Sequence, residues 1–365
     1  MESSRAPNVG AVICVESEAL DRFGPVLRHL FVGLVEQAVP LRLVSSDPRI
    51  QALCLGPVQA VLYPSLHWPT AGRRIERMLD ALSPQPPTVV HAMSRASYRL
   101  ATMIADEFDA DLILEASSLT DCDAAYVGPR ETPARYHAVS QALASILENQ
   151  VRVASEFIEV IPPGVPVSSR VACFSQPHRV PTLLCTSRLA RGSGIDRLIG
   201  VMELLTGRGH EVQLFLLADG PSESALRRQV RARDLSGCVT FAPRLDDLTP
   251  ALLGADIFIR PSQDAEFSAD SLQAMAAGVA VIAQINSACD HLRPGETAMV
   301  CSNTTAEALA ELVEAFLRDR SEAGRIAASG MEYVRRHHGV SAMAERTASA
   351  YRKLALTGTT FAMRG

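Results

Sequence analysis

Residues 239–283 read VTFAPRLDDLTPALLGADIFIRPSQDAEFSADSLQAMAAGVAVIA. The apolar run 257–259 predicts a strand that ends at Pro261, an acidic loop follows, and the spacing predicts a helix over 269–277. Gly278 ends that helix, and a new apolar run begins at once. Open α/β sheets bind ligands where the loop after a strand leads into a helix N-terminus. We therefore expect much of the chemistry of this protein in this stretch.

Outward from this stretch, short apolar runs alternate with helical patterns along nearly the whole chain. This alternation predicts the α/β class, with parallel sheets covered on both faces and two Rossmann-like, doubly wound halves. A polar stretch with two prolines, 168–181, interrupts the alternation, and we place the domain junction there. The predicted division is an N-terminal domain, a C-terminal domain, a last helix and a fraying tail: 1–172, 173–338, 339–356 and 357–365.

The length, charge and cysteine content of the chain exclude several classes of protein. A chain of 365 residues with 47% hydrophobic residues suits two globular domains, and a net charge of −5 argues against a nucleic-acid-binding protein. The eight cysteines are scattered without metal-binding spacing, so we predict a reduced, cytoplasmic protein with no metal site. The N-terminal residues contain no apolar run of the length of a signal peptide or membrane span, which leaves only a peripheral membrane contact open.

Two loops at strand ends have the residues of an anion site. The sequence SRLARGSG (187–194) joins a strand to a helix N-terminus, and its glycines let the backbone approach an anion that Arg188 can pair with. The alternative is a glycine-rich turn with solvated arginines. The second loop, ADGP (218–221), contains Asp219 and Gly220, and for the Asp219 side chain a plain turn is the favoured interpretation.

The acidic loop and the histidines offer further candidates. Glu266 or Asp270 could accept hydrogen bonds from sugar or ribose hydroxyls, because an ionised carboxylate is a pure acceptor. Asp270 also stands in a first helical turn, where the helix dipole stabilises a carboxylate, so Glu266 is the preferred candidate. His91, at a strand end of the first domain, could face a ligand site at the sheet edge, but a structural role is the favoured interpretation. We interpret His337, at a helix end, as structural.

Several ordered segments resemble the retaining, nucleotide-sugar-dependent glycosyltransferases of the GT-B fold, the large family 4 (glycosyl transferases group 1). The segments that carry the resemblance are HAVSQAL (137–143), IEVIPPGV (158–165), SRLARGSGIDRLI (187–199), LADGP (217–221), ADIFIRPS (255–262), EFSADSLQAMAAGVAVIA (266–283) and GVSAMAERTASAYRKL (339–354). The resemblance implies two Rossmann-like domains facing across a cleft, with a nucleoside diphosphate sugar held mainly by the second and no other cofactor. It also implies that the last helix crosses back to the first domain.

The resemblance implies roles residue by residue. Arg188 stands at the position of the family's diphosphate arginine, and Glu266, one residue from a family glutamate, is the other catalytic candidate. The donor-binding candidates are Gly192, Ser193, Gly194, Asp219, Gly220, Arg244, Phe267, Ser268, Ala269, Asp270 and Gln273. Four polar family positions are changed, and they fall at Ser117, Ser193, Ala265 and Gln273. The glycine-rich loop expected after the first strand is also replaced, by residues 16–24.

Three hypotheses follow. The first is a divergent retaining glycosyltransferase that moves a sugar from a nucleoside diphosphate sugar to an unknown sugar, lipid or small-molecule acceptor. The second is a catalytically inactive relative that acts as partner or regulator of an active glycosyltransferase, as the changed positions suggest. The third, less favoured, is a sugar-nucleotide epimerase on the same fold.

Overall fold

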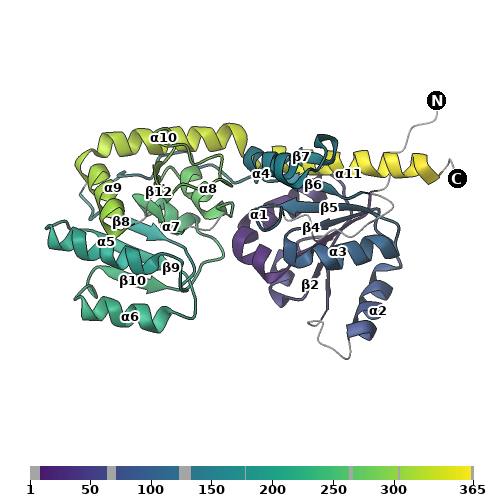
Figure 1. Cartoon of the computed structure of the whole chain (residues 1–365), viewed down its shortest axis with the longest axis horizontal. Helices are drawn as coiled ribbons and strands as arrows, with labels where there is room; N and C mark the ends of the chain where they lie inside the picture. Colours follow the sequence, from purple (N-terminus) through teal and green to yellow (C-terminus); the bar gives the residue numbers. More distant parts are fainter. Residues whose placement is uncertain are drawn as a thin grey trace. The chain divides into compact units, whose positions relative to one another are not determined.

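The computed structural model describes residues 9–63, 71–122, 133–176, 178–262, 266–302 and 305–362. The chain divides into two compact units: unit 1 is Met1–Gly164 with Val340–Gly365, and unit 2 is Val165–Gly339. Each unit contains a parallel sheet with helices packed around it (Figure 1). The predicted α/β class with two Rossmann-like sheets is confirmed.

Unit 1 contains a seven-stranded sheet in the order β3-β2-β1-β4-β5-β6-β7, whose strand pairs are parallel. Its strands are β1 (Ala11–Cys14), β2 (Leu41–Ser45), β3 (Gln59–Leu62), β4 (Val89–Ala92), β5 (Asp111–Ala116), β6 (Arg135–Ala138) and β7 (Ile158–Val160). Every residue of β1 and β4 is buried, as expected for central strands that are covered on both faces.

The helices of unit 1 come from both ends of the chain. They are α1 (Ser17–Glu36), α2 (Ala71–Leu82), α3 (Arg95–Glu107), α4 (Gln141–Ile146) and α11 (Val340–Ala362). Helices α1 and α11 approach closely at Gly33, where an added Cβ would lie 2.4 Å from Cβ of Ala344. Arg352 Nη2 also donates to the carbonyl oxygen of Gln37 at 2.6 Å. Helix α11 continues to Ala362, where the sequence predicts a fraying tail from residue 357, and no proline interrupts these turns.

Unit 2 contains a six-stranded parallel sheet in the order β10-β9-β8-β11-β12-β13. Its strands are β8 (Thr182–Cys185), β9 (Gln213–Leu217), β10 (Val239–Ala242), β11 (Ile257–Arg260), β12 (Ala280–Gln284) and β13 (Met299–Cys301). Its helices are α5 (Ile195–Gly207), α6 (Glu223–Ala232), α7 (Thr249–Leu253), α8 (Ala269–Ala276), α9 (Ala306–Arg318) and α10 (Arg320–His337). Among the helices of the described ranges, none is long and apolar enough to cross a membrane.

The division between the units follows Gly164, whereas the sequence places the junction after residue 172. The intervening segment belongs to unit 2 because its backbone is hydrogen-bonded there. Ser168 N donates to the carbonyl oxygen of Ala276 at 2.9 Å, and Ala172 N donates to that of Gly278 at 3.0 Å. At Gly278, with φ +70°, an added Cβ would lie 2.6 Å from Cα of Val171, so this contact requires glycine.

Each sheet has a point where the strand order reverses. In unit 1 the chain builds outward from β1 to β3 and then returns to the other side of β1 with β4. In unit 2 it builds from β8 to β10 and returns beside β8 with β11. Ligands of open α/β sheets bind outside the carboxyl ends of the strands at such points. The loops after β1 and β4, and after β8 and β11, are therefore the places to look for a site.

Candidate functional site

The loop after β8 leads into α5 through two glycines with left-handed backbone conformations. Gly192 has φ +81° and Gly194 has φ +84°. A Cβ at Gly194 would lie 2.6 Å from the carbonyl oxygen of Pro261, so the loops after β8 and β11 meet where only glycine fits. Gly194 is the N-cap of α5, and no side chain caps the first turn. This helix end therefore offers backbone N–H groups to an anion.

The predicted diphosphate residues lie on this same loop. Arg188 is exposed, and no ion pair or side-chain hydrogen bond joins it to another described residue. Ser193, which occupies the family's lysine position, donates its hydroxyl to the carbonyl oxygen of Ala190 at 2.8 Å. Its side chain therefore closes the turn and brings no charge to it.

The loop after β9 packs directly on the loop after β8. Leu189 N donates to the carbonyl oxygen of Asp219 at 3.1 Å, and a Cβ at Gly220 would lie 2.3 Å from the carbonyl oxygen of Leu189. The carboxylate of Asp219 accepts from the backbone N–H of Arg244 at 3.2 Å. Asp219 and Gly220 thus hold two strand-end loops together, which agrees with the turn interpretation of the Asp219 side chain.

Two of the predicted residues, Arg244 and Asp270, form an ion pair with each other. The guanidinium of Arg244 contacts both carboxylate oxygens of Asp270 at 3.2 Å, and Thr186 Oγ1 donates to the same carboxylate at 2.6 Å. Asp270 lies in the first turn of α8, where the helix dipole adds to its stabilisation. In this arrangement the charges of Arg244 and Asp270 offset each other.

Glu266 is held through its backbone. Its carbonyl oxygen accepts from Asn286 Nδ2 at 2.7 Å and from Arg260 Nη2 at 3.4 Å, while the residue as a whole is half-buried. The preceding residues 263–265, and with them the changed family position Ala265, lie outside the described residues. The sequence did not single out Arg260 or Asn286, although an arginine that ends an otherwise apolar strand is a detectable signal.

The remaining candidates of this segment have mainly structural positions. Phe267 and Ala269 are each 1% exposed, and Ser268 caps α8 by accepting from Ser271 N at 3.2 Å. Their contribution to a ligand site is limited to backbone groups. Gln273 is half-buried, and its Nε2 donates to the carbonyl oxygen of Ala269 at 3.4 Å. The loops that contain Arg188, Asp219 and Arg244 therefore lie together in the structure. The side chains of Phe267, Ser268 and Ala269 are instead buried at the start of α8.

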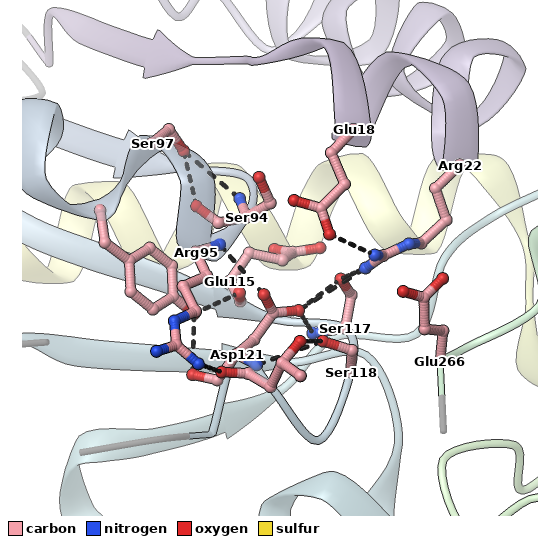
Figure 2. A network of polar contacts seen from close by, with 12 residues as sticks. Glu18, Arg22, Ser94, Arg95, Ser97, Glu115, Ser117, Ser118, Asp121 and Glu266 are labelled. Atoms are coloured by element: carbon pink, nitrogen blue, oxygen red, sulfur yellow. Dashed lines mark hydrogen bonds and ion pairs between the residues drawn. The ribbon is translucent and has the colours of Figure 1, made fainter. Parts of the chain in front are cut away.

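Unit 1 has a polar network at its own carboxyl edge, centred on Asp121 (Figure 2). The Asp121 carboxylate accepts from Ser117 N at 3.0 Å, Ser117 Oγ at 2.9 Å and Arg95 N at 3.0 Å. Its side chain is fully buried. The network therefore ties the loop after β5 to the N-terminus of α3.

Arg22 of α1 brings a cation to this network. Its Nη1 donates to Ser117 Oγ at 2.8 Å and lies 3.6 Å from the Asp121 carboxylate, and its Nη2 pairs with Glu18 at 2.7 Å. The Arg22 side chain is only 8% exposed. Ser117 lies near the position of the family's histidine. Its hydroxyl is hydrogen-bonded to both Arg22 and Asp121. Sequence reasoning missed both partners, because Arg22 lies 95 residues from Ser117 and Asp121 stands outside any recognised motif.

The turn after β1 is occupied by a second hydrogen-bonded carboxylate, that of the half-buried Glu16. Tyr63 and Ser46 each donate a hydroxyl to Glu16 at 2.5 Å, and Glu16 is the residue before α1. Burial, together with the Glu16 carboxylate, raises the pKa of Tyr63 well above its ordinary value, so the phenol remains a donor. This first turn therefore holds side-chain hydrogen bonds where a glycine-rich loop would present backbone groups.

Residues 180–319 match the family described as Glycosyl transferases group 1. An uncharacterised glycosyltransferase, YqgM of Bacillus subtilis, is 26% identical over 57% of this chain and 62% of its own length. A GDP-mannose-dependent monoacylated alpha-(1-6)-phosphatidylinositol monomannoside mannosyltransferase of Corynebacterium glutamicum is 31% identical over 46% of this chain and 45% of its own length. The matches thus span about half to three-fifths of these relatives.

Solved structures match over nearly the whole chain. A sucrose-phosphate synthase from Thermosynechococcus elongatus superposes with a TM-score of 0.78 at 16% identity, covering 96% of this chain and 100% of its own. HepE of Anabaena, crystallised in complex with UDP-glucose, superposes with a TM-score of 0.76 at 14% identity, covering 93% of this chain and 98% of its own. At these identities the likeness establishes the fold.

Proposed function

We propose, from the membership of residues 180–319 in Glycosyl transferases group 1, that the protein transfers a sugar from a nucleoside diphosphate sugar to an acceptor, with retention at the anomeric carbon. The observation that carries the proposal is the loop after β8. There the exposed, cationic Arg188 shares one glycine-rich turn with the uncapped N-terminus of α5. A diphosphate is the ligand such a combination suits.

The chemical demand of the reaction agrees with this arrangement. When the bond from the anomeric carbon to the diphosphate breaks and an acceptor oxygen takes its place, negative charge grows on the leaving group. Arg188 and the helix N–H groups stabilise that charge, with Arg191 of the same exposed loop as a further cation. The charge of Arg244 is already offset by its ion pair with Asp270, so we assign Arg244 to holding the strand-end loops together.

Glu266 and Gln273 are assigned to the sugar or ribose side of the donor. Anchoring of the Glu266 backbone by Asn286 fixes the point from which its carboxylate extends. Gln273 can bond a hydroxyl without the assistance of a charge, which is a weaker contact than a glutamate would make. HepE was crystallised in complex with UDP-glucose and the Corynebacterium relative is GDP-mannose-dependent, so both UDP and GDP donors are to be tested.

A non-catalytic role in partnership with an active glycosyltransferase is the second candidate. The observation that favours it is the use of substituted positions for structure. The Ser117 hydroxyl is bonded to Asp121 and Arg22, and the Ser193 hydroxyl is bonded to Ala190. Neither hydroxyl replaces the charge that a histidine or lysine would bring.

Calorimetric titration with UDP, GDP and ADP tests the donor site. We expect one of them to bind and Arg188→Ala to weaken that binding by at least about tenfold, the loss of one charge-assisted contact. Arg228→Ala, an exposed arginine of α6, is the matched control and should leave affinity unchanged. A folded protein that binds none of the three nucleotides would refute the donor site. Equal affinity of wild type and Arg188→Ala would move the diphosphate elsewhere.

A turnover assay distinguishes an active glycosyltransferase from a non-catalytic partner protein. NMR of the donor during incubation should show release of the sugar with its anomeric configuration retained, and Glu266→Ala should slow that release. Glu296→Ala, at an exposed position of unit 2, is the control. Tight nucleotide binding without any release or transfer would instead support the non-catalytic role. Release unaffected by Glu266→Ala would remove Glu266 from the site.

A further inference from the structure

Three side chains that the proposed transfer does not use meet on one face of the unit 1 sheet. They are His91 of β4, Glu115 of β5 and His137 of β6. The register pairs Glu115 with His137 directly and pairs His91 with Ile113, two residues before Glu115. Side chains two apart in a strand share a face, so all three point to the same side, where α11 packs on β4 and β5.

The three groups are close enough to share one ion. His91 Nε2 lies 3.2 Å from Glu115 Oε2, and the His91 and His137 rings meet edge to face with centroids 5.0 Å apart. One ligand atom from each residue lies within 4.8 Å of the other two. In a tetrahedral zinc site with bonds near 2.0–2.1 Å, neighbouring ligand atoms are about 3.3 Å apart. Small side-chain rotations would therefore close the cluster around a cation.

His91 is oriented as a metal-ligating histidine is. Its Nδ1 lies 2.7 Å from the hydroxyl of Tyr351 on α11, and the ring is 1% exposed. Its other nitrogen, Nε2, faces Glu115 and makes no hydrogen bond with the described residues. Ligating histidines commonly have the second nitrogen held in this way, which fixes the ring and its tautomer.

A small cavity borders two of the three residues, His91 and Glu115, but not His137. It has a volume of about 20 Å³, and most of its other lining is apolar, from α1 and α11. That volume holds one water-sized particle.

We propose that His91, Glu115 and His137 form a binding site for one divalent transition-metal ion of the zinc class. Two imidazoles and a carboxylate are the donor set that such ions accept, and the cavity leaves a further position for water. The ion would link β4, β5 and β6 and, through Tyr351, the helix α11. This site is independent of the proposed sugar transfer.

Titration of the tag-free protein with Co²⁺ tests the site, because cobalt reports its ligands by absorption. We expect one equivalent to bind with the spectrum of a nitrogen- and oxygen-ligated ion, without thiolate-to-cobalt charge transfer from the eight cysteines. Zn²⁺ should displace Co²⁺ and, at a hundredfold excess over Kd, raise the unfolding temperature by on the order of 5 °C.

Single-residue variants test which side chains bind the cobalt ion. Glu115→Gln and His137→Gln should abolish stoichiometric binding, whereas His210→Gln should keep it. His210 is the matched control, a histidine 3.3 Å from the carboxylate of Glu314 on the surface of unit 2. Tyr351→Phe should weaken binding by about 10–100-fold, since it removes only the partner of His91.

The proposal fails if the folded wild-type protein binds no cobalt. It fails equally if Glu115→Gln and His137→Gln, shown by circular dichroism to be folded, bind it as wild type does. Should either variant not fold, Tyr351→Phe decides, and unchanged affinity there overturns the proposal.

Discussion

The carboxyl edges of the two sheets are topologically equivalent and chemically opposite. In unit 1 the carboxylates at this edge contact other groups of the protein. Asp121 contacts Ser117, Arg95 and Arg22, and Glu16 accepts hydrogen bonds from the hydroxyls of Tyr63 and Ser46. In unit 2 the edge has a self-neutralised pair, Arg244 with Asp270, but also an exposed arginine beside an uncapped helix end.

Under the proposed function, this difference would separate the recognition of the acceptor from that of the donor. In unit 1 the carboxylates are already hydrogen-bonded and the edge offers little net charge, which under that proposal would suit a neutral, hydroxyl-bearing acceptor. An edge with backbone N–H groups and an unneutralised cation suits a diphosphate. The topology fixes where both edges lie, and the side chains decide what each can bind.

The largest effect we expect is from Asp121→Ala. Removing this carboxylate takes from Arg22 its buried counter-charge and from two backbone N–H groups their acceptor, so unit 1 should lose about 3 kcal/mol of unfolding free energy. Urea unfolding measures the loss. Asp21→Ala is the matched control, because Asp21 pairs with Arg49 with both side chains more than half exposed, and it should cost under about 1 kcal/mol. Equal costs would show that the unit 1 network is not the stabilising element we describe.

The next effect concerns the turn of unit 2. Gly194→Ala should cost about 2 kcal/mol or more, because it adds a clash with the Pro261 carbonyl to a left-handed backbone. Gly192→Ala has the same kind of backbone but open space around its Cβ, and should cost only about 1 kcal/mol. Unfolding measures the costs, and calorimetry should show weaker nucleotide binding in Gly194→Ala. Indistinguishable variants would mean that the contact between the two loops is unimportant.

The smallest effect is the acid response of unit 1. Hydrogen bonds from Arg49 hold the pKa of Asp47 at about 2, below its unfolded value near 3.9, so its stabilisation is complete above pH 4 and is lost as pH falls toward 2. Since Arg49 is 56% exposed, we expect only about 1 kcal/mol. Between pH 5 and pH 2, wild type should lose that much more unfolding free energy than Asp47→Asn. Parallel pH profiles would contradict the assignment, and the exposed Asp246→Asn should follow wild type.

Much of this architecture could be predicted from the sequence. Continuous apolar runs such as that of β11, ended by Pro261, predicted buried parallel strands. The ordered segments from residue 137 onward predicted the fold and resembled the family whose model matches residues 180–319. Arg188 and the glycines that follow it could be placed on a strand-end turn because every member of that feature is local in sequence. Their roles in binding stay predictions.

The side-chain networks could not be predicted, because their members are distant in sequence. Arg22 meets Ser117 across 95 residues, and the sequence offers no sign of that contact. Arg244 and Asp270 were each predicted as donor-binding residues, yet periodicity cannot show that two such residues neutralise each other. Phe267 and Ala269 match a family segment, but only packing shows that their side chains point into the core of unit 2.

The return of α11 to unit 1 has a consequence for the order of folding during synthesis. Unit 2 is one continuous stretch, Val165–Gly339, and all of it leaves the ribosome before α11 does. Unit 1 is completed only when Tyr351 contacts His91, 260 residues earlier, and Arg352 contacts Gln37, 315 residues earlier. Domains usually fold in the order in which they are made, and closing so long a loop is slow. Here the domain begun first is completed last, and the nascent sheet of unit 1 must stay soluble without its final helix.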